Sequence, residues 1–157
     1  ITRAADSATG SGDATVINSS EGVLYAEISA LTDDLISKSI SVNDSSLSDF
    51  VSISYTFVSN QFRISLTSSS SNVFDQFFTV SDIKNFNKVA VKWGNGIHKV
   101  FINGTQVYSI SSAVNPIGLS ELELSISGSN PFYGKTKDVR VYTTALSDAE
   151  LTTLTTI

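Results

Sequence analysis

The sequence predicts an all-β protein, a two-sheet antiparallel β-sandwich with a short helical turn near its C-terminal end. More than a quarter of the residues are serine or threonine, a composition that disfavours helices and suits pleated sheets with one wet face. About ten short segments alternate apolar and polar residues between frequent turn signals, as sandwiches do. At 157 residues we expect one domain over 1–157, because a second core would be cramped.

The first half of the chain predicts a polar lead-in followed by five strands. Residues 1–20 are small and polar, which indicates a loop or an edge strand. Two-residue periodicity then predicts strands over 22–28, 36–42, 51–57, 62–67 and 73–80. The apolar positions that mark one face of these strands include Leu24, Ala26, Ile28, Ile36, Ile40, Val42, Val51, Ile53, Tyr55 and Phe57.

The second half predicts further strands over 89–93, 101–102, 107–110, 122–126 and 139–141. Gly94-Asn95-Gly96 is a tight-turn signal, and Asn103-Gly104 predicts a hairpin because both residues tolerate positive φ. Ser147 is placed to cap a helix, and Glu150 stands three residues later as a capping box requires.

The charge and composition exclude several classes of partner. The net charge is −5 and no dense patch of Lys and Arg exists, so we expect no nucleic-acid partner. No apolar run approaches the roughly 20 residues that span a bilayer, so we expect no membrane insertion. The absence of cysteine removes disulfides and thiolate metal sites. The chain begins at Ile1 and contains no Met, so we expect a piece cut from a longer polypeptide with neighbouring domains.

Two stretches of the second half carry a family likeness. Residues 88–107 place Val89-Ala90-Val91-Lys92-Trp93 before Phe101-Ile102-Asn103-Gly104, and residues 132–151 place Asp138-Val139-Arg140-Val141-Tyr142 before Ala145-Leu146-Ser147-Asp148-Ala149-Glu150-Leu151. The first resembles the hairpin of laminin-G-like domains, and the second resembles their closing strand and helix. This resemblance implies a concanavalin A-like jelly roll, a fold that hosts lectins, carbohydrate-binding modules, glycoside hydrolases and structural modules.

A third stretch points to a biological setting. Thr2-Arg3-Ala4-Ala5-Asp6 precedes Ser20-Glu21-Gly22-Val23-Leu24-Tyr25-Ala26-Glu27. This order is similar to the opening of laminin-G-like domains in bacteriophage tail and tail-fibre proteins. The resemblance implies a virion tail component, or another extracellular location.

Sugar binding needs an aromatic ring for the apolar face of a pyranose and planar polar groups for its hydroxyls. The candidate residues for carbohydrate binding are Tyr25, Asn60, Arg63, Trp93, Asn130, Phe132 and Tyr133. Trp93 shares a face with Val89 and Val91, which favours burial in the core. Tyr25 lies opposite the face of Leu24, which favours exposure. In the resembling family the segment at 132–134 is structural, so we expect one of its two rings to be buried.

Arg63 alternates with core residues and therefore points away from the core. It shares its side of the sheet with Ser52, Ser54, Ser65 and Thr67. This polar side indicates either a shallow binding groove or a simply solvated sheet face.

Two acidic residues raise the question of catalysis. Glu121 and Glu123 lie two apart on an expected strand, so both project to one face roughly 7 Å apart, a spacing that suits retaining glycoside hydrolysis. Laminarinase-type relatives of this fold carry a third carboxylate, which is replaced here by Ile126. Solvated edge charges are therefore the favoured interpretation. The single histidine, His98, is expected to be exposed or half-buried. The sequence offers no partners for a catalytic triad around it, so we expect the protein to have no catalytic activity.

A calcium site is a further possibility. Relatives of the resembling family often carry an acidic pair at the position of Asp138 that can hold Ca²⁺, a cation that takes six to eight oxygen ligands. Here the first residue of that pair is Lys137, whose ammonium group would repel the ion. Other acidic residues expected in loops could supply ligands, namely Asp13, Asp33, Asp34 and Asp44.

These observations leave three functions open. The leading hypothesis is a non-catalytic module that binds cell-surface carbohydrate as part of a phage tail or tail-fibre protein. The second is a structural or assembly domain of a virion or adhesin, which predicts an oligomer and an apolar surface patch. The third is a carbohydrate-binding module attached to a polysaccharide-degrading enzyme, which differs from the first in its neighbouring domains.

Overall fold

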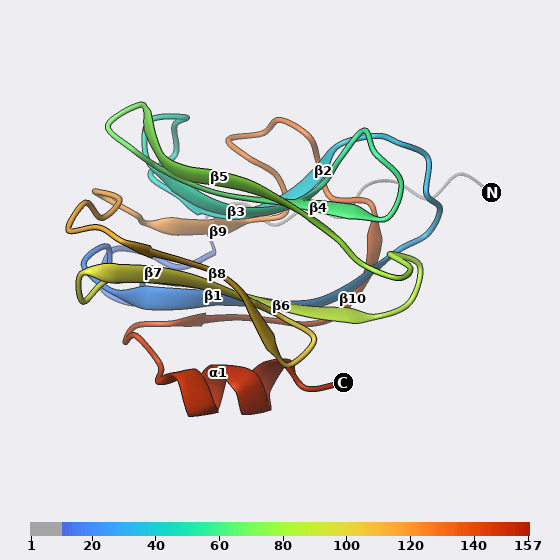
Figure 1. The fold of residues 1–157 in the computed structure, drawn as a ribbon. Coiled ribbons are helices and arrows are strands. Elements are labelled where there is room, and N and C mark those ends of the chain that lie inside the picture. The colour runs from blue at the N-terminus through green and yellow to red at the C-terminus, as the bar shows by residue number, and fades with distance from the viewer. Residues whose placement is uncertain (1–10) are drawn as a thin grey trace.

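The computed structural model of the protein describes residues 11–157, and the motif at 2–6 lies outside the described residues. The elements in chain order are β1 (Gly22–Ala30), β2 (Lys38–Asn43), β3 (Phe50–Tyr55), β4 (Gln61–Ser68), β5 (Ser71–Thr79), β6 (Asn87–Trp93), β7 (Ile97–Ile102), β8 (Thr105–Ser111), β9 (Glu121–Glu123), β10 (Gly134–Tyr142) and α1 (Asp148–Thr155). The strands form two five-stranded sheets with the orders β10-β1-β6-β7-β8 and β5-β4-β3-β2-β9. The sheets face each other with α1 outside one of them (Figure 1), and the paired strands run antiparallel. The predicted sandwich with a C-terminal helix is confirmed.

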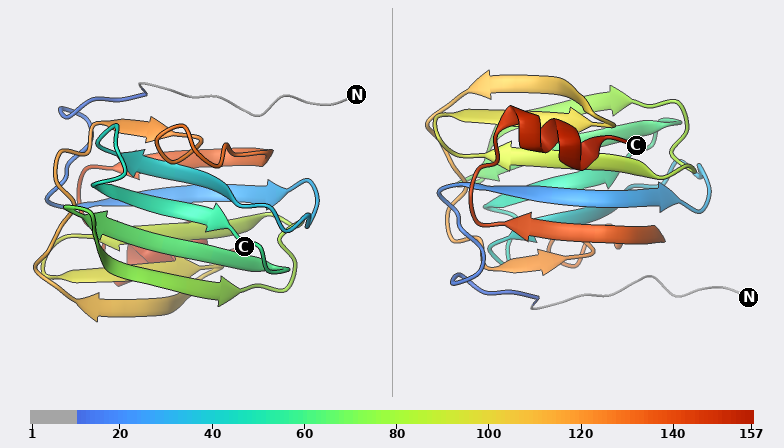
Figure 2. Two further views of the ribbon diagram at one scale, coloured as in Figure 1. Left: turned by 90° about the horizontal axis from the view of Figure 1, so that it is seen from above. Right: turned by 90° about the horizontal axis from the view of Figure 1, so that it is seen from below.

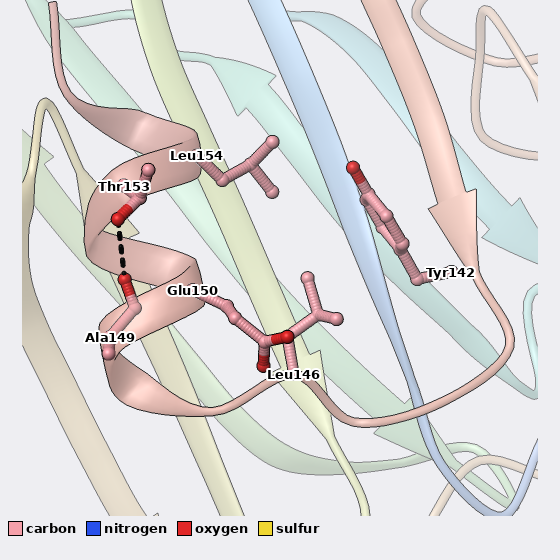
Figure 3. A pocket seen from close by; sticks show the side chains of 6 residues that line it. All are labelled: Tyr142, Leu146, Ala149, Glu150, Thr153 and Leu154. Carbon is pink, nitrogen blue, oxygen red and sulfur yellow. Dashed lines mark hydrogen bonds between the residues drawn. The ribbon is translucent and has the colours of Figure 1, made fainter.

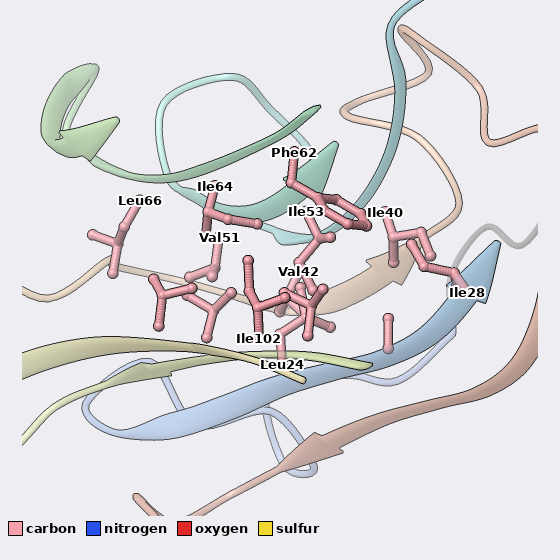
Figure 4. Close-up of a cluster of buried hydrophobic side chains, with 14 of the residues drawn as sticks. Leu24, Ile28, Ile40, Val42, Val51, Ile53, Phe62, Ile64, Leu66 and Ile102 are labelled. Carbon is pink, nitrogen blue, oxygen red and sulfur yellow. The ribbon is translucent and has the colours of Figure 1, made fainter. Parts of the chain in front are cut away.

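Alternating apolar residues of the two sheets meet in the interior (Figure 4). Leu24 and Ile28 of β1 face Ile40 of β2 and Ile53 of β3, and all four side chains are buried. Burying each such side chain stabilises the fold by about 1.5–3 kcal/mol. Trp93 belongs to the same core, and its indole Nε1 donates to the carbonyl oxygen of Asn18 at 3.0 Å, which ties the lead-in segment to β6.

Tight turns connect the neighbouring strands where the sequence contains residues that accept positive φ. Asn103 and Gly104 have φ values of 50° and 81° between β7 and β8, as predicted. Ser69 and Ser70 have φ values of 49° and 63° and join β4 to β5. The run of four serines at 68–71 is therefore a two-residue hairpin turn flanked by strand residues, since Ser68 pairs with Ser71.

The helix α1 covers the outer face of the sheet that contains β1. Ser147 and Glu150 form the predicted capping box, in which the Ser147 side chain accepts from the backbone N–H of Glu150. Leu151 reaches down from the helix into a second apolar cluster with Val23 and Tyr25 of β1. The view from below shows the helix lying across this sheet (Figure 2, right). No helix within residues 11–157 is long and apolar enough to cross a bilayer.

Three expected strands extend two or three residues beyond the observed ones at one end. Ile36 precedes β2 and Phe57 follows β3, and both side chains are exposed, Phe57 to 72%. The Thr56 hydroxyl accepts from the backbone N–H of Val58 at 3.0 Å, a local turn that ends the strand early. The expected strand at 122–126 stops at Glu123, and the chain then turns back through positive φ at Ser127 and Gly128, where Ile126 pairs with Ser129.

Candidate functional site

The sheet β5-β4-β3-β2-β9 has an outer face that α1 does not cover (Figure 2, left). The side chains directed to it are mostly short and polar, and we call this surface the serine face. Its members are Ser39, Ser41 and Asn43 of β2, Phe50, Ser52 and Ser54 of β3, Arg63, Ser65 and Thr67 of β4, Asp75 and Phe77 of β5, and Glu121 and Glu123 of β9. The polar side of Arg63 that the sequence predicts is therefore confirmed, and it extends over the whole sheet.

One row of directly opposed residues crosses all five strands of the serine face. It runs Glu123, Ser41, Ser52, Ser65 and Asp75, so a carboxylate stands at each end of three hydroxyls. The hydroxyl oxygens of Ser52 and Ser65 lie 2.8 Å apart. The Ser41 hydroxyl donates to the carbonyl oxygen of Ser125 at 2.6 Å. These serines are buried between their neighbours. Their hydroxyl groups are therefore held in fixed positions by hydrogen bonds within the protein and are not freely solvated.

The adjacent row contains Arg63 and Phe77. Arg63 stands opposite Phe77 and diagonal to Asp75. Its Nε and NH2 atoms donate to the two carboxylate oxygens of Asp75, each at 2.7 Å, a bidentate pair that fixes the guanidinium plane. Hydrogen bonding to Asp75 raises the pKa of Arg63. The guanidinium carbon lies 5.8 Å from the ring centroid of Phe77, which is within cation–π range.

Phe77 is an exposed aromatic residue of this surface that was not among the candidates predicted from the sequence. Its side chain is 54% exposed and stands beside the Arg63–Asp75 pair. A signal for it exists in the sequence, because Phe74 and Phe78 alternate with Asp75 and Phe77 along the expected strand. Phe74 and Phe78 must then share one side of the strand, and Phe77 must share the other side with Asp75. An exposed ring next to fixed donors and acceptors is the arrangement that binds a sugar ring.

Two loops rise above the serine face at its β2 and β9 side (Figure 1). The loop at 44–49 and the loop at 124–131 contact each other, since the Ser127 hydroxyl donates to the carbonyl oxygen of Ser46. Glu123 accepts from the Ser125 hydroxyl at 3.0 Å and from the Gly128 backbone N–H at 3.4 Å. The Ser45 hydroxyl donates to Glu121.

The two glutamates share one face, as predicted, but the interpretation of Glu123 as a solvated edge charge is wrong. Its side chain is buried, with the residue 7% exposed, because the loop at 124–131 folds over it. The observed partners of Glu121 and Glu123 are groups of the two loops, so both carboxylates hold the rim of the serine face in place.

Three of the predicted sugar-binding rings are buried. Tyr25 was expected to be exposed, and that expectation is wrong, because α1 covers its side of the sheet and leaves 2% of the residue exposed. Burial raises the pKa of Tyr25 to about 12. Trp93 lies in the core, as its position beside Val89 indicates. Phe132 is buried and stacks on Tyr55 with ring centroids 5.9 Å apart.

Tyr133 is half-exposed next to the buried Phe132, so one ring of this pair is buried, as expected. Asn60 occupies a turn with φ 55°, and its side-chain oxygen accepts from the Ile83 backbone N–H at 3.1 Å. Its amide therefore serves the loop structure. Asn130 is exposed in the loop beside β2, where its carbonyl oxygen accepts from the Ser39 backbone N–H at 2.9 Å. The structure therefore places Arg63 on the serine face, the backbone of Asn130 at the edge of the same sheet, and Asn60 in a turn.

Asp138 lies on the outer face of the other sheet, opposite Glu27. It forms an ion pair with Arg140 at 2.6 Å, and Glu27 forms one with Lys137 at 2.8 Å. Residues 11–157 contain no group of three or more His, Cys, Asp or Glu side chains that could hold a metal ion. The loop acids instead accept local hydrogen bonds, as Asp13 does from Thr15, Asp33 from Asn60, Asp34 from Ile36 and Asp44 from Ser46.

The expectation that His98 is exposed or half-buried is wrong, because it is fully buried. Its Nδ1 accepts from the Gly94 backbone N–H at 3.4 Å, and its Nε2 lies 2.8 Å from the carbonyl oxygen of Val114. Burial lowers its pKa. The imidazole thus serves as a structural bridge between the β6–β7 turn and the segment after β8.

A separate hollow of about 450 Å³ lies between α1 and the end of β10 (Figure 3). Tyr142, Leu146 and Leu154 give it an apolar lining. Its polar side chains bond locally, Glu150 to the helix cap and Thr153 to the carbonyl oxygen of Ala149 at 2.9 Å. This hollow therefore lacks the convergent polar groups that orient a sugar.

Several solved structures share this fold at low sequence identity. The carbohydrate-binding module CBM40 of the Ruminococcus gnavus IT-sialidase, bound to α2,3-sialyllactose, is 20% identical with a TM-score of 0.72, and the match covers 90% of this chain and 86% of that one. Domain 4 of the extracellular arabinanase from Geobacillus stearothermophilus, in complex with arabinotriose, is 17% identical with a TM-score of 0.68 and coverages of 92% and 70%. The leech intramolecular trans-sialidase is 23% identical with a TM-score of 0.69, and the match covers 89% of this chain but 24% of the enzyme.

A comparison with curated protein sequences finds no match. The family model of the concanavalin A-like lectin/glucanases superfamily matches residues 24–152. This range includes β1 from its third residue onward, all of β2 to β10, and the larger part of α1. The jelly-roll arrangement of the two sheets and the capped closing helix agree with that match. The chain therefore belongs to the concanavalin A-like lectin/glucanases superfamily.

Proposed function

We propose that this domain is a non-catalytic recognition module that binds carbohydrate on the serine face. The observation that carries the proposal is the bidentate pair of Arg63 and Asp75 beside the exposed ring of Phe77. The ring offers an apolar plate for one face of a sugar. The guanidinium and carboxylate groups offer donors and acceptors in fixed positions for its hydroxyls.

The fold neighbours support the class of ligand. Two of them are domains solved with a sugar bound, CBM40 with sialyllactose and the arabinanase domain with arabinotriose. Their identities of 20% and 17% to this chain are too low to carry over their binding residues. The ligand proposal for this protein therefore rests on its own serine face, where Arg63 is the predicted sugar-binding residue that lies on it.

We further propose that the domain works outside the cell, in a phage tail or tail-fibre protein that recognises a host surface polysaccharide. The similarity of the opening segment, residues 2–27, to phage tail proteins supports this setting. A targeting module of a polysaccharide-degrading enzyme is the alternative, supported by the leech trans-sialidase, in which such a fold makes up 24% of the chain. The coding sequence on either side separates the two, because tail domains and a hydrolase domain are distinct neighbours.

The binding proposal is tested on an array of bacterial surface polysaccharides, followed by calorimetry on each glycan that binds. Phe77→Ala should weaken binding by about 1 kcal/mol, roughly fivefold in affinity, and Arg63→Ala should weaken it at least as much. Phe86→Ala is the matched control, because Phe86 is also partly exposed but stands beside Lys137 of the other sheet. An array without any binding, or an equal loss in all three variants, contradicts a sugar site on the serine face.

A second candidate function, assembly, is favoured by one feature of the surface. Five large apolar side chains are exposed on two neighbouring loops at one end of the sandwich, namely Leu31, Leu35, Ile36, Phe57 and Val58. Asp33 binds the two loops together by accepting from Ser59 and from the backbone of Asn60. Such a patch would stabilise contact with a second copy of the chain. Sedimentation should then show association that Phe57→Asp abolishes, and a monomer at every concentration contradicts assembly through this patch.

A further inference from the structure

We infer that the serine face selects an uncharged sugar and rejects sialic and uronic acids. This inference rests on the proposed function, because it specifies the ligand class of the same site. It departs from the fold neighbour CBM40, which was solved with sialyllactose. Two features of the face favour a neutral ligand, namely the balance of its charges and the pairing of Arg63 with Asp75.

Acidic side chains outnumber basic ones on the serine face. Among residues 11–157, Asp75, Glu121 and Glu123 point to it, and Arg63 is the one cation that does. Lys38 of β2 stands opposite Tyr55, on the other side of the sheet, and pairs with Asp34. A carboxylate ligand would therefore meet net negative charge, which costs free energy in a partly desolvated site.

Six of the ten Lys and Arg residues lie on the opposite sheet. Strands β6, β7 and β10 carry Lys88, Lys92, Lys99, Lys135, Lys137 and Arg140. The two outer faces of the sandwich therefore differ in charge, although the net charge of the whole chain is only −5. An anionic glycan would find its cations on the far side of the sandwich, away from Phe77.

Asp75 balances the charge of Arg63 and lies beside its remaining donors. The carboxylate of Asp75 accepts one N–H of Nε and one of NH2, so a ligand would meet the second N–H of NH2 and the two of NH1 next to that carboxylate. That carboxylate keeps lone pairs that accept further hydrogen bonds. A sugar hydroxyl both donates and accepts, so neighbouring hydroxyls satisfy the two groups together. A ligand carboxylate only accepts, so it would face Asp75 without a proton to share.

The test is an array that prints neutral and acidic oligosaccharides in pairs, including lactose with 3′-sialyllactose and arabinotriose with a galacturonic acid trimer, beside neutral and acidic bacterial polysaccharides. We expect the wild-type protein to bind neutral members of the array and to bind their acidic counterparts roughly tenfold more weakly or not at all. Raising the salt concentration should narrow this difference, because salt screens the repulsion.

Asp75→Asn removes one negative charge and keeps the shape of the side chain, so it should strengthen binding of acidic members at least severalfold. Asp148→Asn is the matched control, because Asp148 also pairs with a cation, Lys99, but lies on α1 at the far side. Acidic sugars that bind as well as neutral ones overturn this inference and leave the proposed function standing. Absence of binding to every member contradicts the proposed function itself, and with it the inference.

Discussion

The imidazole Nε2 of His98 lies 2.8 Å from the carbonyl oxygen of Val114, while Nδ1 of the same ring accepts from the Gly94 backbone N–H at 3.4 Å. The ring therefore carries its proton on Nε2 and is neutral, because a protonated Nδ1 could not accept that hydrogen bond. The two contacts bridge segments that lie on opposite sides of β7 in the sequence. Burial of the ring makes this bridge sensitive to pH.

We expect the protein to lose stability as the pH falls below about 6.5, the ordinary pKa of histidine. Burial lowers the pKa of His98 in the folded state, so at mildly acidic pH the unfolded chain takes up a proton that the folded chain does not. The free energy of unfolding should then decrease by at most about 1.4 kcal/mol per pH unit. Urea unfolding at pH 7.0 and 5.5 measures this change in the free energy of unfolding. His98→Gln should remove the pH dependence of stability in this range, since the chain has one histidine. An unchanged slope in that variant assigns the effect to other groups.

Leu151 anchors α1 to the sheet, so we expect Leu151→Ala to destabilise the protein by about 2–5 kcal/mol. The residue is fully buried against the cluster that contains Tyr25. Loosening the helix should also bring the pKa of Tyr25 down from about 12 toward that of an exposed tyrosine, which an absorbance titration of the phenol detects. Ile157→Ala, at the exposed end of the chain, is the control and should change stability by less than about 0.5 kcal/mol. Equal effects of the two changes would show that α1 does not depend on this contact.

Two glycines of the β6–β7 turn should differ sharply in their tolerance of alanine. A Cβ on Gly94 would lie 2.4 Å from Cβ of Glu21 and 2.7 Å from the carbonyl oxygen of Ser20, and the residue has φ 101°. Gly94→Ala should cost at least about 3 kcal/mol, since clash and backbone strain add. Gly96 has φ 73° but open space around it, so Gly96→Ala should cost about 1 kcal/mol from strain alone. Thermal unfolding of both variants compares them, and similar losses would mean that Glu21 yields easily.

Glu123 holds the rim loop of the serine face, so Glu123→Ala should release the segment at 124–130. The change removes the acceptor for the Ser125 hydroxyl and the Gly128 backbone N–H, at a cost of about 1–3 kcal/mol. Amide hydrogen exchange should accelerate at Gly128 while the amides of β3 and β4 keep their protection. Glu150→Ala, on the far side of the molecule, is a control that should leave exchange at Gly128 unchanged. Unaltered exchange in Glu123→Ala would show that the loop is held by its other contacts.

Local patterns were sufficient for most of the framework. The alternation of Leu24, Ala26 and Ile28 predicts an inner face because side chains of a strand change sides at every residue. The Asn103-Gly104 turn and the Ser147–Glu150 capping box were also predictable, since each depends on the backbone preferences of adjacent residues. The same reasoning failed for Phe57, where a turn at Thr56 ended the strand before the alternation did.

The candidate site was predicted only in part. The polar side of Arg63 followed from alternation, but Phe77 and Asp75 joined Arg63 through the pairing of β4 with β5, and Glu123 joined through that of β2 with β9. A one-residue shift of register would turn those side chains to the opposite face. The sequence of a single strand does not determine which residues of the neighbouring strand pair with it.

By itself, then, the sequence determined the strands, the tight turns, the helix cap and the side of each strand that is apolar, because these depend on residues close together in the chain. Tertiary structure decided which apolar side met the core and which side the helix covered. Tyr25 shows the difference, since Leu151 buries it from more than a hundred residues away. The run Val23-Leu24-Tyr25-Ala26 was apolar on both sides, as strands covered on both faces are, yet only the packing of α1 selected this sheet. The other sheet was left open with its serines, Arg63 and Phe77, because the chain has a single helix among its described residues and it can cover one face.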